Sequence, residues 1–281
     1  MPLFETAALA VLLGITEFLP VPASAHLALA SQWFGRSSLP AGLLFAVHVG
    51  LLLAVVSYYL ADLVKISFYF IDSLAKRKAG PVARIGYCLL LASLPSAAFW
   101  FFLGGITREL MQSIRVIAWA TLGYGLLLGV SSYVNRHLVW RNILNIEGER
   151  HDSLRHVTFA QALVIGCAQV LAFVPGTSRC GITLTAGLFL GLRPEAAARF
   201  SYLLSIPALL VLSIVEGGQM LDEPALFGDW PKFMACGAIS LFVGLACIHL
   251  FMKYISKPGI AFFVAYRCVL GVLLLFVSGA F

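Results

Sequence analysis

The stretch GITEFLPVPASAH, which runs from Gly14 to His26, interrupts an apolar segment with two prolines and ends in a side chain that can carry positive charge. The stretch GCAQVLAFVPGTSR, from Gly166 to Arg179, has a similar pattern, with one proline, small hydroxyl residues and a basic side chain at its end. With one extra residue in the second stretch, the alignment pairs Gly14 with Gly166, Glu17 with Gln169, Leu19 with Leu171, Val21-Pro22 with Val174-Pro175, Ser24 with Thr177 and His26 with Arg179. In a membrane protein, two interrupted apolar segments at corresponding positions of two halves indicate a binding site. We therefore expect the two loops to meet near the centre of the membrane.

The composition indicates an integral membrane protein. Of the 281 residues, 60% are hydrophobic and 11% are charged, whereas about a quarter of the residues in soluble domains are charged. The mean hydropathy is +0.94. The net charge of +6 does not indicate nucleic-acid binding, because the basic residues lie in short segments between apolar ones. No basic residue precedes Arg36, so the N-terminal residues are not expected to be a signal peptide.

Six apolar segments are long enough to cross a bilayer, which takes about 20 residues. They are residues 39–60, 85–104, 116–134, 199–214, 233–252 and 260–281. Residues 2–35 and 157–191, which contain the two quoted stretches, are each interrupted near the middle. We interpret each as a re-entrant hairpin of two short helices, since irregular backbone is tolerated at that depth only within protein or beside a wet cavity.

The charges of the connecting segments predict how the chain is oriented. Residues 61–84 and 136–155 are rich in Lys and Arg and are assigned to the cytoplasmic side, whereas residues 216–229 carry only acidic charges and are assigned to the outside. These assignments agree if each half contributes one hairpin without a net crossing and three transmembrane helices. Both termini then lie outside, and the second half is inverted relative to the first. The predicted fold is a single all-α membrane domain over residues 1–281, with pseudo-repeats at about 1–135 and 156–281 joined by a basic cytoplasmic loop at 136–155.

The second loop carries groups that bind an anion. Gly176 gives the backbone freedom, Thr177 and Ser178 supply hydroxyls, and Arg179 supplies a guanidinium. Arginine binds phosphate oxygens with two parallel hydrogen bonds, and the N-terminus of the helix that follows attracts anions. These groups predict a phosphate site within the membrane, and a phosphate at that depth belongs to a lipid.

Glu17 and His26 are the candidates from the first loop. An ionisable side chain within the bilayer is costly unless it is paired or hydrated, so each indicates a function by default. Glu17 could instead be a structural residue that bonds to the partner loop, and His26 could cap a helix. The pairing of His26 with Arg179 in the alignment favours a place in the site. Gln169 could simply satisfy the backbone of the broken helix, and His48 is interpreted as a core histidine with a partner.

GITEFLPVPASAHL and PGTSRCGIT resemble the two signatures of the bacterial undecaprenyl-pyrophosphate phosphatases. FAVHVGLLLAVV, ARFSYLLSIPAL and the Tyr266-Arg267 pair resemble further segments of that family, so the resemblance extends over nearly the whole chain. It implies a multi-pass protein of the bacterial inner membrane that removes the terminal phosphate of undecaprenyl pyrophosphate. This reaction recycles the lipid carrier for cell-wall synthesis and is linked to bacitracin resistance. The resemblance implies no organic cofactor and leaves open a homodimer.

The implied reaction would use residues of both loops. The catalytic residues would be Glu17, Ser24, His26 and Arg179, and the phosphate-binding residues would be Gly176, Thr177, Ser178 and Arg179. Arg179 would neutralise the charge that develops on the phosphate, and His26 would act as nucleophile or general acid/base. Glu17 would orient His26 or share a magnesium or calcium ion.

Two positions depart from the family pattern. The family usually has two glutamates one helical turn apart, and here Leu13 takes the first position while Glu17 takes the second. Ala23 takes the position of the family's suspected catalytic serine, so Ser24 would have to supply a hydroxyl. A single carboxylate makes a poor divalent-ion site. The resemblance therefore supports phosphate binding by this chain more directly than it supports hydrolysis.

A non-hydrolytic flippase for a polyprenyl phosphate or a related phospholipid is the alternative function. Inverted repeats with broken helices are typical of secondary transporters. The loss of a carboxylate and of a serine is also compatible with transport. Phosphate release from undecaprenyl pyrophosphate distinguishes the two functions.

Overall fold

The computed structural model describes residues 2–34, 39–78, 80–103, 113–143, 154, 157–221, 229–255 and 259–278. Within these residues the regular elements are all helices, and none is a strand. They are α1 (Leu3–Phe18), α2 (Ala23–Phe34), α3 (Ala41–Tyr58), α4 (Leu60–Lys76), α5 (Pro81–Leu103), α7 (Ile114–Ile143), α8 (Phe159–Val170), the 3-10 turn η2 (Leu171–Phe173), α9 (Arg179–Phe189), α10 (Pro194–Leu221), α11 (Trp230–Tyr254) and α12 (Gly259–Val277).

Six helices are long and apolar enough to cross a membrane, namely α3, α5, α7, α10, α11 and α12. They coincide with the six apolar segments of the sequence, and an all-helical, multi-pass fold is confirmed. Each interrupted segment forms two shorter helices, as expected. The longest of these four, α1, has 16 residues.

Helix α10 continues beyond the end that the sequence predicts. Residues from 216 onward were expected to form an external loop, but α10 ends at Leu221. Glu216 is 8% exposed, and its carboxylate lies 2.6 Å from Nδ1 of His48 on α3. Because the carboxylate has this partner, it can be buried and the helix can continue. His48 is thus confirmed as a core histidine with a partner, whereas Asp222 and Glu223, on which the external assignment depended, lie outside the described residues.

Two basic segments that were expected to be loops contain helices. Residues 61–84 include most of α4, which is tied to α10 by an ion pair between Asp62 and Arg199. Helix α7 continues to Ile143, so the first part of the expected 136–155 loop is helical as well. Lys and Arg have helix propensities close to that of Leu. A basic composition therefore indicates a polar segment without excluding a helix.

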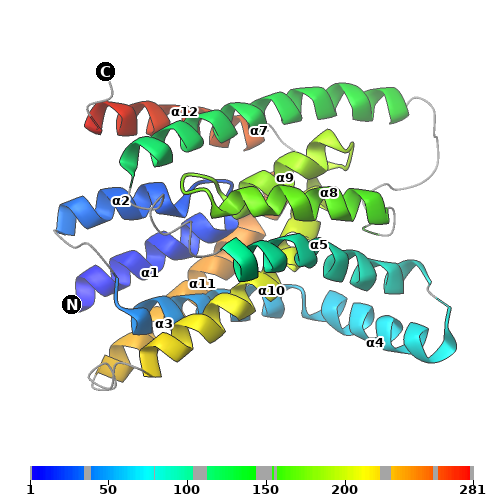
Figure 1. Ribbon diagram of the computed structural model, residues 1–281, viewed down its shortest axis with the longest axis horizontal. Coiled ribbons are helices and arrows are strands. Elements are labelled where there is room, and N and C mark those ends of the chain that lie inside the picture. The colour runs from blue at the N-terminus through cyan, green and yellow to red at the C-terminus, as the bar shows by residue number, and fades with distance from the viewer. Residues whose placement is uncertain are drawn as a thin grey trace.

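In Figure 1, α7 and α12 lie side by side along one face, α3 and α10 lie along the opposite face, and the two hairpins, α1–α2 and α8–α9, lie between them. Helix α11 packs against α1 and α3, and α5 packs against α4 and α8. The packing is exchanged between the halves of the chain, because α1 packs against α11 and α8 packs against α5. In both cases the first helix of a hairpin packs against the second long helix of the other half.

Gly14 and Gly166, which the repeat alignment pairs, make these two helix contacts close. A Cβ atom at Gly14 would lie 2.9 Å from the side chain of Val243 on α11. A Cβ atom at Gly166 would lie 2.3 Å from the carbonyl oxygen of Ala92 on α5. Small residues let membrane helices approach closely, so the two glycines set the position of each hairpin against the opposite half.

Gly166→Ala is expected to destabilise the fold, because the added Cβ would meet a backbone carbonyl group that cannot turn away. The expected cost is about 1–3 kcal/mol, the usual effect of overpacking, and the melting temperature of the detergent-solubilised protein measures it. Gly123→Ala on α7 is the control, since a Cβ atom there meets nothing within 4 Å. Equal melting temperatures for the two variants would contradict the close contact of α8 with α5.

Candidate active site

Each hairpin turns through a short stretch of non-helical backbone. Residues 19–22 separate α1 from α2, and residues 174–178 separate η2 from α9. Gly176 has a φ of +91°, and a Cβ atom there would lie 2.3 Å from the carbonyl oxygen of Ile117, so this position requires glycine. Ser178 caps α9, because its hydroxyl accepts a hydrogen bond of 3.1 Å from a backbone N–H of the first turn.

The two loops contact each other directly, as the alignment predicts. The N–H of Gly176 donates to Oγ of Ser24 in the first hairpin (2.7 Å), and the hydroxyl of Ser178 donates to the carbonyl oxygen of Leu19 (3.2 Å). A backbone group without a partner in an apolar environment costs several kcal/mol. These bonds therefore stabilise the pair of loops. Ser24, which was expected to supply a catalytic hydroxyl, accepts the Gly176 bond.

Arg267 of α12 connects the two loops. Its side chain is 1% exposed and donates to the carbonyl oxygens of Pro20 (3.4 Å), Gly176 (3.0 Å) and Thr121 (3.3 Å). One guanidinium thus bonds a carbonyl group in each loop and a third on α7. The sequence reasoning gave Arg267 no role beyond its place in a family segment. Its position inside an apolar span was the signal that could have identified it.

Glu17 of the first hairpin and Arg179 of the second form an ion pair. The side chains are 15% and 16% exposed, and Nη1 of Arg179 also donates to the carbonyl oxygen of Ser205 on α10 (3.0 Å). A buried charge without a partner would be strongly destabilising. The sequence predicts both residues for the site, and the structure brings them together from the two hairpins.

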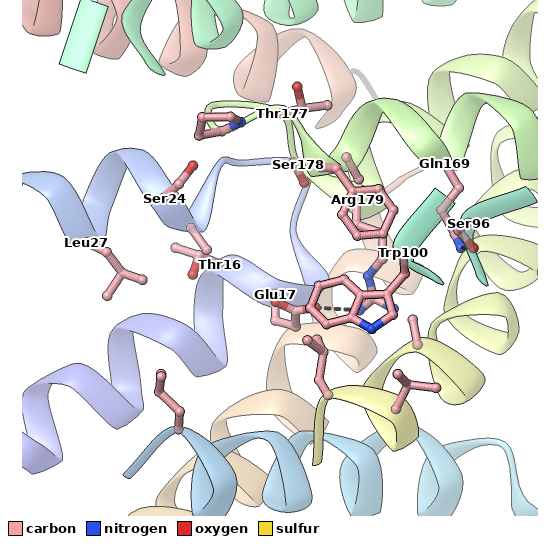
Figure 2. A pocket seen from close by; sticks show the side chains of 18 of the residues that line it. Thr16, Glu17, Ser24, Leu27, Ser96, Trp100, Gln169, Thr177, Ser178 and Arg179 are labelled. Atoms are coloured by element: carbon pink, nitrogen blue, oxygen red, sulfur yellow. Dashed lines mark hydrogen bonds and ion pairs between the residues drawn. The ribbon is translucent and has the colours of Figure 1, made fainter. Parts of the chain in front are cut away.

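A cavity of about 1080 Å³ lies beside this ion pair. Its polar lining residues are Thr16, Glu17, Ser24, Ser93, Ser96, Gln169, Thr177, Ser178 and Arg179. The remaining lining is apolar and includes Leu27, Trp100 and Phe173. Figure 2 shows Glu17 and Arg179 facing each other, with Ser178 on the neighbouring loop. Such a cavity is suited to a ligand with an anionic head group and an apolar chain.

The structure does not bring His26 to this cavity. Its Nδ1 lies 2.7 Å from the carbonyl oxygen of Pro22, and its Nε2 lies 2.5 Å from the hydroxyl of Tyr266, on which its ring also stacks. Helix α2 packs against α7, and His26 is not among the residues that line the cavity. Equivalence with Arg179 in the repeat therefore does not put the two side chains in one pocket. A role for His26 in the reaction stays a prediction.

The two departures from the family pattern have different surroundings. Leu13 is 3% exposed within the hydrophobic core, whereas Ala23 lines the cavity without offering a hydroxyl. Among the described residues, no three His, Cys, Asp or Glu side chains are grouped to hold a metal ion. Glu17 offers one carboxylate, and that carboxylate is bonded to Arg179. Since magnesium and calcium require several oxygen ligands, these residues do not fit a divalent ion held by the protein alone.

Gln169 is a cavity residue that the sequence reasoning left outside the site. It was interpreted as a partner for the backbone of the broken helix, but its amide nitrogen donates to Oγ of Ser96 on α5 (2.7 Å). Its alignment with Glu17 was the signal that could have placed it in the site.

The sequence of the chain places it in one family of bacterial membrane proteins. Residues 6–273 match the family described as "Bacitracin resistance protein BacA", so the chain belongs to that family. It is 37% identical over 276 residues to the undecaprenyl-diphosphatase of Nitrosococcus oceani, which covers 98% of this chain and 99% of the relative. It is 38% identical over 271 residues to the undecaprenyl-diphosphatase of Hahella chejuensis, 96% of each chain. It is also 38% identical over 277 residues to undecaprenyl-diphosphatase 2 of Stutzerimonas stutzeri, 98% of each chain.

Arg267→Met is expected to lower the melting temperature of the purified protein, because three carbonyl groups lose a donor. The loss of a hydrogen bond from a charged donor costs about 1.5–3 kcal/mol. Arg136→Met is the control, since Arg136 is an exposed arginine on α7. The connecting role of Arg267 would be refuted if the two variants melted at the same temperature.

Proposed function

We propose that this protein is a membrane-embedded undecaprenyl-diphosphatase of the bacterial inner membrane. It removes the terminal phosphate of undecaprenyl diphosphate and returns the monophosphate carrier to cell-wall synthesis. Membership of the family and the names of the relatives support this activity. The structural observation that carries it is the Glu17–Arg179 pair at the polar part of an otherwise apolar cavity. A phosphate on a long apolar chain matches both parts.

In this proposal Arg179 binds the diphosphate. Its guanidinium can form two parallel hydrogen bonds to phosphate oxygens, while Glu17 and the Ser205 carbonyl group hold it in position. Thr177 offers a hydroxyl, and the N-terminus of α9 adds a partial positive charge at the same place. Fixed donors in a cavity with apolar walls stabilise the negative charge of the transferred phosphate far better than water does.

His26 contributes by fixing α2, according to this proposal. Its bond to Tyr266 holds α2 against α12, and its bond to the Pro22 carbonyl ties it to its own loop; together they keep Ser24 against the second loop. Both of its ring nitrogens have partners outside the cavity, which supports a positioning role.

We also propose that the two hairpins meet at the middle of the membrane in an inverted repeat. The exchanged packing of α1 with α11 and of α8 with α5 supports this arrangement, and so do the equivalent contacts of Gly14 and Gly166. Such reciprocal contacts are expected when two similar halves are related by a two-fold axis in the membrane plane. With both termini outside, the basic segment 136–155 would face the cytoplasm.

Transport of a polyprenyl phosphate without hydrolysis is the second candidate function. The exchanged packing of the halves favours it, because inverted repeats with broken helices are typical of secondary transporters. A transporter would also have no use for the hydroxyl that Ala23 lacks.

Release of inorganic phosphate from undecaprenyl diphosphate by the purified protein separates these functions. The diphosphatase is expected to release phosphate over many turnovers, whereas a transporter binds the lipid and releases none. Assays with magnesium, with calcium and with a chelator are expected to differ little, because Glu17 is the one carboxylate among the described residues that line the cavity. Complete loss of activity in the chelator would contradict this expectation.

Arg179→Ala is expected to lower kcat/KM by about 1000-fold, as the removal of an arginine that stabilises a transferred phosphate typically does. Binding of undecaprenyl phosphate should weaken as well, because Glu17 becomes an unpaired carboxylate beside the ligand. Arg179→Lys should recover part of the activity, since an ammonium group supplies the charge without the two parallel bonds.

Arg199→Ala is the matched control for Arg179→Ala. It removes another partly buried arginine that forms an ion pair, with Asp62, but Arg199 does not line the cavity. Its KM should stay close to that of the native protein. Undiminished lipid binding in Arg179→Ala would show that the phosphate binds elsewhere.

A further inference from the structure

Two residues that line the cavity each have a buried polar atom without a hydrogen-bond partner among the described residues. These atoms are Oε1 of Gln169 and Oγ1 of Thr177, whose residues are 4% and 8% exposed. A buried polar atom without a partner costs about 1–3 kcal/mol. Because both residues line the cavity, a ligand or a water molecule bound there is the nearest source of a hydrogen-bond partner for these atoms. Their chemistry therefore indicates which kind of group lies next to each.

Helix α5 fixes the orientation of the Gln169 amide. The hydroxyl of Ser96 donates its one hydrogen to the carbonyl oxygen of Ser93 (3.1 Å). Ser96 can then only accept from Gln169, whose Nε2 lies 2.7 Å away. One N–H of the amide is thus bonded to α5, and the carbonyl oxygen is the amide atom that has no partner among the described residues.

A carbonyl oxygen is the wrong group for an ionised phosphate oxygen, because both are acceptors. Donors for the phosphate come from Arg179 and from the hydroxyl of Thr177. In the view of Figure 2, Gln169 and Ser96 lie on one side of Arg179, and Ser24 lies on the other. The Gln169 carbonyl needs a donor that accompanies the phosphate, and a water molecule meets that need.

We propose that Gln169 positions the water molecule that attacks the terminal phosphorus, which rests on the diphosphatase function above. The water donates a hydrogen bond to Oε1 of Gln169 and approaches phosphorus opposite the bridging oxygen. The bond from water oxygen to phosphorus forms as the bond from phosphorus to the bridging oxygen breaks. The electron pair of the broken bond stays on the bridging oxygen and gives undecaprenyl phosphate. Both water hydrogens end on the released inorganic phosphate, so no further reactant is needed.

Gln169 can act in this way without taking a proton, since placing a nucleophile correctly is itself a large part of catalysis. Direct attack by water also accounts for hydrolysis by a chain that has Ala23 in the cavity instead of a serine. Glu17 holds the corresponding position in the first hairpin and is bonded to Arg179. One hairpin thus holds the phosphate-binding arginine in place while the other holds the water.

Gln169→Met keeps the length of the side chain and removes the acceptor. The kcat for phosphate release from undecaprenyl diphosphate should fall about 100-fold, while KM and the affinity for undecaprenyl phosphate stay within about twofold. Gln169→Glu restores an acceptor oxygen and should recover most of the lost kcat, with a higher KM because its charge repels the diphosphate. Gln161→Met is the matched control: Gln161 lies on the same helix and caps it, does not line the cavity, and should leave kcat unchanged.

A native kcat in Gln169→Met overturns the inference, as does a raised KM at unchanged kcat. Equal loss of activity in the Met and Glu variants with weaker binding of undecaprenyl phosphate would make the role structural, which overturns it too. If Gln169→Met does not fold, Ser96→Ala is the second variant. It removes the hydrogen bond between the amide and α5, and it should lower kcat about tenfold at unchanged KM. An unchanged kcat in Ser96→Ala also overturns the inference.

The same assays separate this inference from the proposed function. Native protein that binds undecaprenyl diphosphate and releases no phosphate overturns the diphosphatase function and the inference together. Native protein that releases phosphate, with Gln169 variants of native kcat, overturns the inference alone.

Discussion

Each broken hairpin supplies hydrogen-bond partners that the other lacks, and the rest of the structure depends on this exchange. The N–H of Gly176 is bonded by Ser24 of the first hairpin, and the carbonyl oxygen of Leu19 is bonded by Ser178 of the second. Arg267 bonds a carbonyl group in each loop from a third element. Backbone groups in an apolar environment must be satisfied within the protein. The two loops therefore stabilise each other and are stable as a pair.

The need to satisfy backbone hydrogen bonds brings the two loops together, and the same contact forms the candidate site. Where two helix hairpins meet end to end, N–H groups, hydroxyls and one guanidinium collect around a common space. Arg179 can be buried there only beside an anion, and Glu17 provides one from the opposite hairpin. A lipid phosphate provides a second anion of matching geometry, and the apolar lining accommodates the chain that carries it. Burying the charge of Arg179 costs free energy unless an anion lies beside it. The fold meets this need with Glu17, and the same need favours an anionic ligand.

The six spans could be predicted from the sequence, and so could the choice of Glu17 and Arg179 as site candidates, because ionisable residues are rare in apolar segments and the repeat related the two loops. The ion pair between them was not predicted, since Glu17 was expected to orient His26 or to share a metal ion. The sequence did not distinguish His26, which faces Tyr266, from Gln169, which faces the cavity, since the direction of each side chain depends on the neighbouring helices. Glu216 was assigned to a loop because its partner on α3 lies 168 positions away. The basic segments were expected to be loops, although Lys and Arg favour helices nearly as well as Leu does.

An experimental structure of the protein with undecaprenyl phosphate bound tests the central claim most directly, namely that the two hairpins build one phosphate site around Arg179. We predict the phosphate at the polar part of the cavity, with two guanidinium nitrogens of Arg179 at about 2.7–2.9 Å from its oxygens. The prenyl chain should follow the apolar lining past Trp100 and Phe173. A phosphate bound at another place, with the Glu17–Arg179 pair unchanged and the cavity without lipid, would contradict the claim.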